Sequence, residues 1–208
     1  MEKIRLNHPT LVLWAGVAAV GKTTLLDQVI ENVEDAFIIE KDVIADSFLT
    51  THHDSEKEGV SLYKLSGPLI HRPSSHYNAH IKFQHYRCML ALARHNLERG
   101  KHPIIDGNFS NLIPMRYLEE VIDPFFAETE HTRKIVYCHA PEEVIKKRME
   151  KRGESRDKQF YETQEAWERY IKERPIVPKE LEHYDHLKVD TSETPCLNAR
   201  RVLDYLQS

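Results

Sequence analysis

Short apolar runs alternate along the 208-residue chain with longer segments in which apolar residues recur every three or four positions. The short runs are bounded by turn residues and predict buried strands at 10–15, 36–39, 102–106, 133–139 and 184–190. The periodic segments predict helices at 24–33, 43–49, 81–99, 115–126 (interrupted at Pro124), 141–152, 158–170 and 197–206. This alternation is typical of an α/β fold, in which helices cover both faces of a parallel sheet.

The length and a hydrophobic content of 40% suit one domain with a sizeable core. The formal charge of −4 argues mildly against a surface built for nucleic acid, although a local basic groove stays open. Cys88, Cys138 and Cys196 have no zinc or CxxC spacing, which indicates reduced thiols and a cytoplasmic protein. The apolar run 11–20 lacks a signal-peptide cleavage pattern, and no run is long enough to span a bilayer.

The first predicted strand runs directly into a glycine loop that fits the pattern Gly-x4-Gly-Lys-Ser/Thr. The loop is followed by Thr24 and reads Gly16-Val17-Ala18-Ala19-Val20-Gly21-Lys22-Thr23. In such a loop, backbone N–H groups and the positive end of the following helix converge on a phosphate. Lys22 then reaches the β- and γ-phosphates, and the Thr23 hydroxyl ligates Mg²⁺. A chance glycine turn is the alternative, but strand, loop and helix come in the required order, so we predict a nucleoside triphosphate site.

Two aspartates end predicted strands beside this loop. Asp42 follows the strand 36–39, and Asp106 ends the strand 102–106. Ligands of open α/β sheets bind outside the carboxyl ends of the strands, so both side chains are expected to face the crevice of the loop. Asp106 fits the Walker B arrangement, in which a carboxylate holds Mg²⁺ directly or through water. The alternatives are an ordinary Asp-Gly turn for Asp106 and a helix N-cap for Asp42.

Arginines on the predicted helix 141–152 form a further candidate. Arg148 and Arg152 are four residues apart and share one face, and Arg156 follows beyond Gly153. A charged helix face is usually only solvated. In a protein that binds a triphosphate, however, guanidinium groups suit the charge spread over a transferring phosphoryl group. We therefore interpret Arg148 and Arg152 as functional and leave Arg156 open.

Together these segments resemble the P-loop kinases, a group that includes nucleoside monophosphate, shikimate, gluconate and adenylylsulfate kinases, zeta toxins and polynucleotide 5′-hydroxyl kinases. The resemblance rests on the glycine loop and on the segments 40–42, 104–107, 136–152 and 189–192. It implies a P-loop NTPase fold with five parallel strands, a single domain over 1–208, a mobile lid at 148–160, and ATP with Mg²⁺.

The resemblance also implies roles for individual residues. Asp42 matches an acceptor-side aspartate that orients or deprotonates the attacking hydroxyl. Arg148 matches an arginine near the adenine or the phosphates, and Arg152 matches a lid arginine. Thr191 and Ser192 fall where the loop after the last strand lines the adenine pocket.

Residues 50–78 break the periodic pattern and are rich in polar and turn-forming residues. Long segments of this kind are usually functional or mobile, so we interpret 50–80 as an acceptor-binding insertion. It holds several of the 13 histidines, and His76 and His80 are one helical turn apart. No carboxylate or cysteine with recognisable spacing accompanies them, so substrate-facing or solvated histidines are favoured over a metal site.

The predicted activity is transfer of the γ-phosphoryl group of ATP to a hydroxyl of a small molecule. A polynucleotide 5′-hydroxyl acceptor is the second hypothesis, because the insertion offers aromatic and basic side chains, but the net charge disfavours it. A regulatory nucleotide switch is the third, although the chain lacks the Asn-Lys-x-Asp motif of guanine-specific switches. The identity of the acceptor and the oligomeric state stay open.

Overall fold

The computed structural model describes residues 3–49 and 74–208, which are built around five parallel strands. The strands lie in the order β2-β3-β1-β4-β5, and every pairing between neighbours is parallel. Their bounds are β1 Thr10–Ala15, β2 Ala36–Glu40, β3 His102–Asp106, β4 Thr132–His139 and β5 Leu187–Asp190. The five-stranded parallel sheet expected from the sequence is therefore confirmed.

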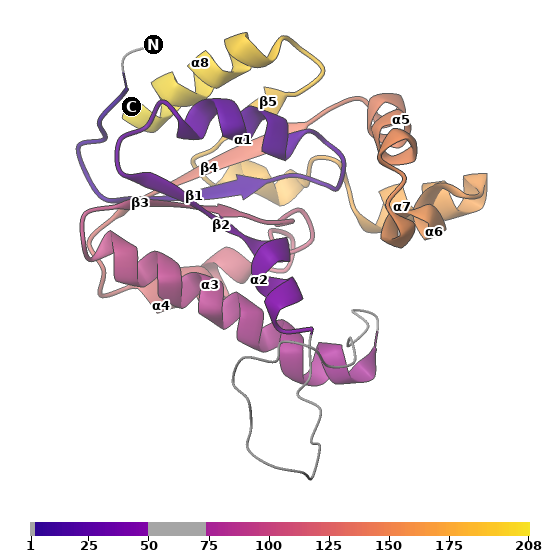
Figure 1. Ribbon diagram of the computed structural model, residues 1–208, viewed down its shortest axis with the longest axis horizontal. Helices are drawn as coiled ribbons and strands as arrows, with labels where there is room; N and C mark the ends of the chain where they lie inside the picture. The colour runs from indigo at the N-terminus through magenta and orange to yellow at the C-terminus, as the bar shows by residue number, and fades with distance from the viewer. Residues whose placement is uncertain (1–2, 50–73) are drawn as a thin grey trace, which may run out of the picture.

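Helices cover both faces of this sheet (Figure 1). On one face lie α1 (Lys22–Ile30) and α8 (Pro195–Gln207), and on the other lie α3 (Lys82–Leu97) and α4 (Asp123–Phe126). All six residues of β1 are buried, and alternate side chains enter different core layers: Val12 and Trp14 join one cluster, and Leu11 and Leu13 join the other. Because side chains alternate along a strand, a continuous apolar run is what a strand covered on both faces requires.

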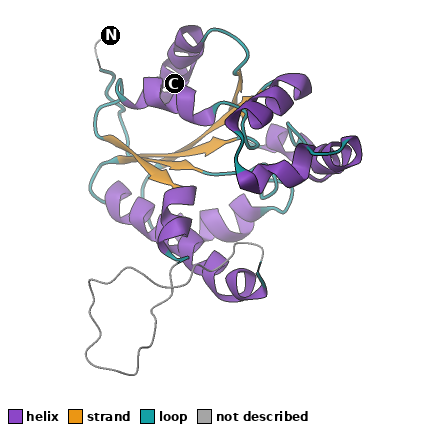
Figure 2. Cartoon of the chain, turned by 45° about the vertical axis from the view of Figure 1, so that its right-hand side comes forward, coloured by secondary structure: helices purple, strands orange, loops and turns teal. Residues whose placement is uncertain are grey.

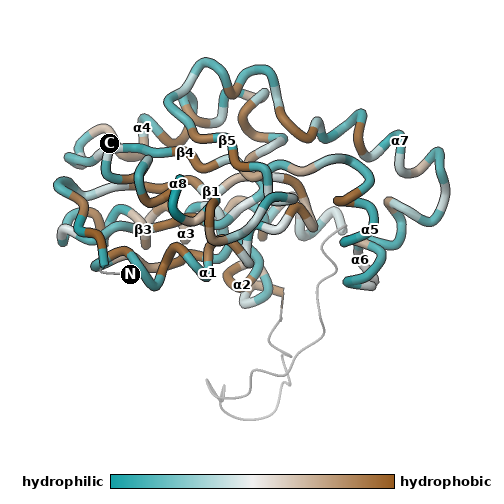
Figure 3. Tube along the Cα trace, turned by 90° about the horizontal axis from the view of Figure 1, so that it is seen from above, coloured by the Kyte–Doolittle hydropathy of each residue, from teal (hydrophilic) through white to brown (hydrophobic). Residues whose placement is uncertain are grey.

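Three helices project beyond the carboxyl ends of the strands, and we call them the outer helices (Figures 1 and 2). They are α5 Glu142–Arg152, α6 Ser155–Tyr161 and α7 Gln164–Glu173. Figure 3 shows that they are largely hydrophilic, whereas β1 is hydrophobic. Trp167 of α7, which is buried, links two of them, because its Nε1 donates to Glu142 Oε1 of α5 at 2.5 Å.

Some predicted bounds are wrong near the outer helices and β5. The single helix expected at 158–170 is two helices, because the Thr163 hydroxyl accepts a hydrogen bond from the Ala166 N–H at 3.1 Å and starts α7 anew. The last strand is shorter than 184–190, because it pairs with β4 only over Leu187–Asp190.

Some predicted helices begin at residues other than those observed. Residues 118–122 form a π-helix that runs into α4, so Pro124 stands in the first turn of α4 instead of interrupting a helix that begins at 115. The helix expected at 43–49 is α2 (Lys41–Ser47), which follows β2 without a loop. A further π-helix, Tyr77–Ile81, leads into α3.

Most of the predicted insertion at 50–80 lies outside the described residues, so its role stays a prediction. Within 3–49 and 74–208, no three histidine, cysteine or acidic side chains are grouped as a metal site. Over the same residues, no helix is both long and apolar enough to cross a membrane.

Candidate functional site

The glycine loop between β1 and α1 has a backbone conformation that requires glycine at two positions. Gly16 has φ 139° and Gly21 has φ 102°, both in the region that side chains disfavour. A Cβ atom on Gly16 would lie 2.5 Å from the Cys138 carbonyl oxygen, so the loop packs directly on the backbone of β4. Ala19, between the two glycines, also has a positive φ of 59°. The loop therefore forms the tight turn that a phosphate-binding loop needs.

Lys22 begins α1 and reaches back over the loop. Its Nζ donates to the carbonyl oxygens of Gly16 at 2.9 Å and Val17 at 3.2 Å. Burial lowers the pKa of Lys22, and the Asp106 carboxylate is the largest of the effects that oppose this. The backbone around it is fixed as well, because Trp14 Nε1 donates to the Lys22 carbonyl at 3.3 Å. The ammonium is thus held beside the loop, where a phosphate would bind.

A cavity of about 990 Å³ opens over the loop and is bordered by the carboxyl ends of the strands and by the outer helices. Most of the residues predicted for the site line it, namely Ala18, Ala19, Val20, Gly21, Lys22, Thr23, Thr24, Asp42, Asp106, Arg148, Arg152 and Thr191. Three others do not: Gly16 and Val17 are buried, and Ser192 bonds to Asp190 on the exposed surface. The structure therefore gathers residues from five separate segments around one space.

The two aspartates border this cavity near the carboxyl ends of the strands, as expected from the sequence. Asp106 is opposite Trp14 in β1 and opposite Glu40 in β2, so the ends of the three strands are level. Asp42 lies in the first turn of α2, whose N-cap is Glu40, so Asp42 is not the N-cap. Lys41 Nζ is 3.4 Å from Asp42 Oδ1, and both side chains border the cavity.

Asp106 has the properties expected of a cation ligand. Its Oδ1 is buried and has no hydrogen-bond partner among the described residues. Burial raises the pKa of Asp106, and the Lys22 ammonium is the largest effect that opposes this. The Thr23 hydroxyl borders the same cavity. An unsatisfied carboxylate oxygen and a hydroxyl are hard oxygen donors, so these residues fit Mg²⁺.

Arg148 links the glycine loop to Thr191, the residue that follows β5, through hydrogen bonds. Its Nη1 donates to the Val20 carbonyl at 2.8 Å and to the Thr191 hydroxyl at 3.0 Å, and its Nη2 donates to the Thr191 carbonyl at 2.8 Å. The Thr191 hydroxyl also bonds to the Val20 carbonyl. A guanidinium fork can make such a planar set of bonds, whereas a lysine ammonium cannot.

Arg152 is placed differently from Arg148. It forms an ion pair with Asp157, a carboxylate that is only 3% exposed. Both residues border the cavity. The charge of Arg152 is thus compensated within the outer helices, and its predicted contact with a transferring group stays a prediction.

The outer helices contribute functional candidates that the sequence did not reveal. Phe160, Tyr170 and Arg174 border the cavity, and the Arg174 guanidinium lies 5.1 Å from the centroids of both rings. The only signal in the sequence was the apolar stripe of residues 158–170, which pointed to a buried face but not to a cavity wall. This cationic and aromatic wall results from the break at Thr163, which lets α7 fold back against α6.

The fold and the glycine loop define a P-loop NTPase, and a P-loop domain implies nucleotide binding. Residues 11–175 match the AAA domain family, and the chain belongs to that family. No protein with a curated description matches it in sequence.

Solved structures share the fold at low identity. A protein from Chloroflexus aurantiacus, provisionally described as a kinase, has a TM-score of 0.62 and 17% identity, covering 96% of each chain. A sugar kinase from Janibacter sp. has a TM-score of 0.55 and 16% identity, covering 96% of this chain and 94% of that one. A gluconokinase from Sinorhizobium meliloti has a TM-score of 0.53 and 15% identity, covering 97% and 93%. The chain thus has a P-loop fold like that of small-molecule kinases.

Proposed function

We propose that this protein is an ATP-dependent kinase that transfers the γ-phosphoryl group to a hydroxyl of a small molecule. The observation that carries the proposal is a single cavity lined by the glycine loop, by Lys22 and by the carboxylates of Asp42 and Asp106. The effect of Asp106 and Asp42 on the pKa of Lys22 indicates that all three charges act on the same space. A donor phosphate and an acceptor hydroxyl could be held next to each other there.

On the donor side, the loop amides and the start of α1 bind the phosphates. Lys22 would exchange its bonds with the Gly16 and Val17 carbonyls for phosphate oxygens, so its charge meets the β- and γ-phosphates. Thr23 and Asp106 would hold Mg²⁺, which supplies charge neutralisation at these phosphates. Thr191, fixed by Arg148, lies where the base of the nucleotide is expected.

On the acceptor side, Asp42 orients the hydroxyl and accepts its proton. The hydroxyl oxygen then forms a bond to the γ-phosphorus, the bond from that phosphorus to the β–γ bridging oxygen breaks, and ADP leaves. Asp42 fits this role because its half-exposed side chain is on the cavity border, at the carboxyl end of the sheet. The neighbouring Lys41 ammonium is 3.4 Å from the Asp42 carboxylate.

A neutral polyol is the acceptor that this arrangement favours. Glu40 and Asp42 border the cavity where the acceptor is proposed to bind, and an anionic acceptor would be repelled by these carboxylates. Ala45 and Asp46 stand where many P-loop kinases carry an arginine for an anionic acceptor. The sugar kinase and the gluconokinase that share the fold are consistent with a polyol, although their likeness to this chain concerns the fold alone.

The experiment is a phosphoryl-transfer screen with γ-labelled ATP over sugars, other polyols and 5′-hydroxyl oligonucleotides, at two salt concentrations. We expect a labelled polyol, with transfer that Asp42→Asn stops while ATP binding is retained. Asp27→Asn makes the same change at an exposed residue of α1 outside the cavity lining, so it is the control and should behave as wild type.

Two outcomes would contradict the proposal. Transfer only to oligonucleotides, weakening steeply with salt, would identify a polynucleotide kinase, because counterion release gives that salt dependence. ATP hydrolysis that no acceptor stimulates, unaffected by Asp42→Asn, would favour the regulatory switch.

A further inference from the structure

The hydroxyl of Tyr170 has no partner in the part of the chain that the structure describes. Tyr170 lies on α7, is 2% exposed and borders the cavity above the glycine loop. Its hydroxyl oxygen is buried, yet it makes no hydrogen bond within the described residues. A buried hydroxyl without a partner costs free energy, so such a group calls for a ligand that completes it.

The surroundings of this hydroxyl select an anion as that ligand. The ring of Tyr170 packs against Phe160 and Trp167, with centroids 4.9 and 5.4 Å away, and so has a fixed direction. The Arg174 guanidinium lies 5.1 Å from its centroid. Burial raises the pKa of Tyr170, and this is opposed by the charge of Arg174 and by the backbone N–H of Ala18 in the glycine loop. A loop amide, a guanidinium and a phenol donor thus converge on one region.

We propose that the Tyr170 hydroxyl donates a hydrogen bond to the terminal phosphate of a bound nucleoside triphosphate, with Arg174 adding its positive charge to the same phosphate. The proposal rests on the proposed nucleotide site. We choose the terminal phosphate because Tyr170 borders the cavity beside Ala18, near the start of the loop, whereas Arg148 and Thr191 bond to Val20, further along it. Tyr170 then distinguishes a triphosphate from a diphosphate.

The test uses Tyr170→Phe, which removes only the hydroxyl and leaves the stacked ring. Titration calorimetry would measure binding of ADP and of the non-hydrolysable triphosphate β,γ-imido-ATP to the full chain. We expect β,γ-imido-ATP to bind about tenfold more weakly than to wild type, with ADP affinity unchanged, since a hydrogen bond to a charged group is of that order. The melting temperature should stay close to that of wild type, because the hydroxyl lies near the Ala18 N–H but makes no hydrogen bond of normal geometry within the described residues.

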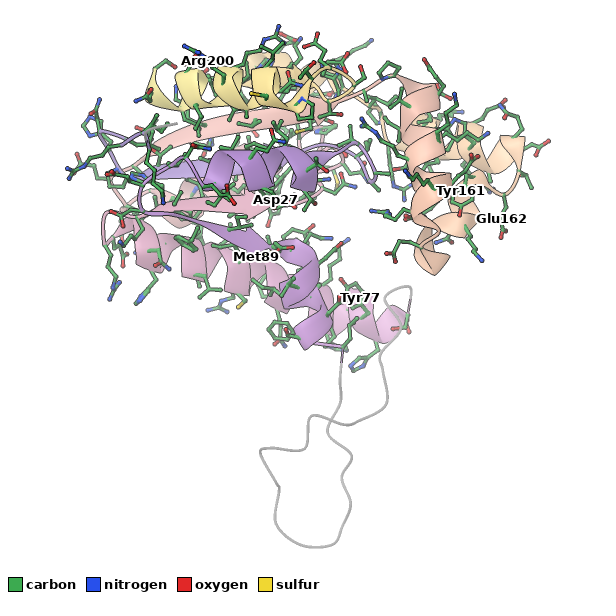
Figure 4. The ribbon with its side chains drawn as sticks, turned by 45° about the horizontal axis from the view of Figure 1, so that its top comes forward. Asp27, Tyr77, Met89, Tyr161, Glu162 and Arg200 are labelled. Atoms are coloured by element: carbon green, nitrogen blue, oxygen red, sulfur yellow. The ribbon has the colours of Figure 1, made fainter. Side chains whose placement is uncertain are left out.

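Matched controls come from the same helices. Tyr161→Phe makes the same change on α6 (Figure 4), at a residue that does not border the cavity, and should leave both affinities unchanged. Arg174→Gln should weaken β,γ-imido-ATP more than ADP, whereas Arg169→Gln, on the exposed side of α7, should weaken neither.

The outcomes separate this inference from the nucleotide site itself. If wild type prefers β,γ-imido-ATP and Tyr170→Phe keeps that preference in full, the role of Tyr170 is refuted while the site stands. An equal loss for both nucleotides, or a lower melting temperature, would assign the hydroxyl a structural role and also refute it. If wild type binds neither nucleotide, the proposed function fails first.

Discussion

Replacing Gly16 by alanine should be the most damaging small substitution in the glycine loop. Two destabilising effects act together at this position: strain of the backbone and a steric overlap with β4. At φ 139° an alanine is strained, which costs about 1–3 kcal/mol. Its Cβ would also stand 2.5 Å from the backbone oxygen of Cys138, where no side-chain rotation relieves the contact, and overpacking of this kind adds about 1–3 kcal/mol. We therefore expect Gly16→Ala to lower the free energy of unfolding by roughly 2–6 kcal/mol.

Gly100→Ala is the matched control, because it adds the same methyl group without a steric overlap. Gly100 also has a positive φ, 75°, but a Cβ there would meet no heavy atom of the described residues within 4 Å. Strain alone should cost about 1 kcal/mol, partly offset by the lower entropy of the unfolded chain. Urea denaturation of both variants and of wild type gives the comparison.

ATP affinity distinguishes a Gly16→Ala loop that keeps its position under strain from one that shifts. If the loop shifts to relieve the contact, stability partly recovers but the amides move, so ATP affinity measured by calorimetry should fall sharply. Equal stability of Gly16→Ala and Gly100→Ala, together with wild-type ATP affinity, would refute the reasoning.

Three further predictions concern single contacts. Lys22→Ala should slow phosphoryl transfer by on the order of 10²–10³, since it removes one placed charge; a rate within a few-fold of wild type in the labelled-ATP assay would contradict the proposed role. Arg148→Lys cannot reproduce the three bonds to Val20 and Thr191 and should lower the free energy of unfolding by about 1–2 kcal/mol, measured in urea, with no change as the contrary result. Burial holds the pKa of His102 below its ordinary value, and its Nδ1 accepts from the Thr10 N–H at 3.2 Å, so the folded state keeps the neutral ring while the unfolded chain binds a proton. Stability should therefore fall as the pH drops below about 6.5. His102→Asn should make this fall less steep in melting temperatures measured from pH 7.5 to 5. An unchanged slope would rule out His102 as the source of the pH dependence.

The sheet and its loop could be predicted because their signals are local. Residues 10–15 form a continuous apolar run because both faces of β1 are covered, and the glycine pattern follows from the backbone conformation that a phosphate loop needs. Asp42 and Asp106 were found by the same logic, since parallel strands place their carboxyl ends at one edge. What they do chemically stays a prediction.

The rest depended on contacts between distant parts of the chain. Nothing near Arg148 in the sequence reveals that its partners are carbonyls of the glycine loop and of residue 191. Tyr170 and Arg174 looked like an amphipathic helix and its end, because a helical stripe has the same pattern whether it faces a core or a cavity. Their place on the cavity wall follows from the cap at Thr163, whose effect on helix direction is a tertiary property.

The register between β1 and β3 limits which changes of chain length the protein tolerates. Trp14 is opposite Asp106, and Asp106 is opposite Glu40, so the carboxylate faces the cavity only while β3 keeps its present pairing. Inserting or deleting one residue within His102–Asp106 would turn every following side chain to the opposite face, sending Asp106 toward the helices and an apolar neighbour toward the nucleotide. Length variation among natural homologues should therefore be absent from this strand and concentrate in connections that do not set its phase.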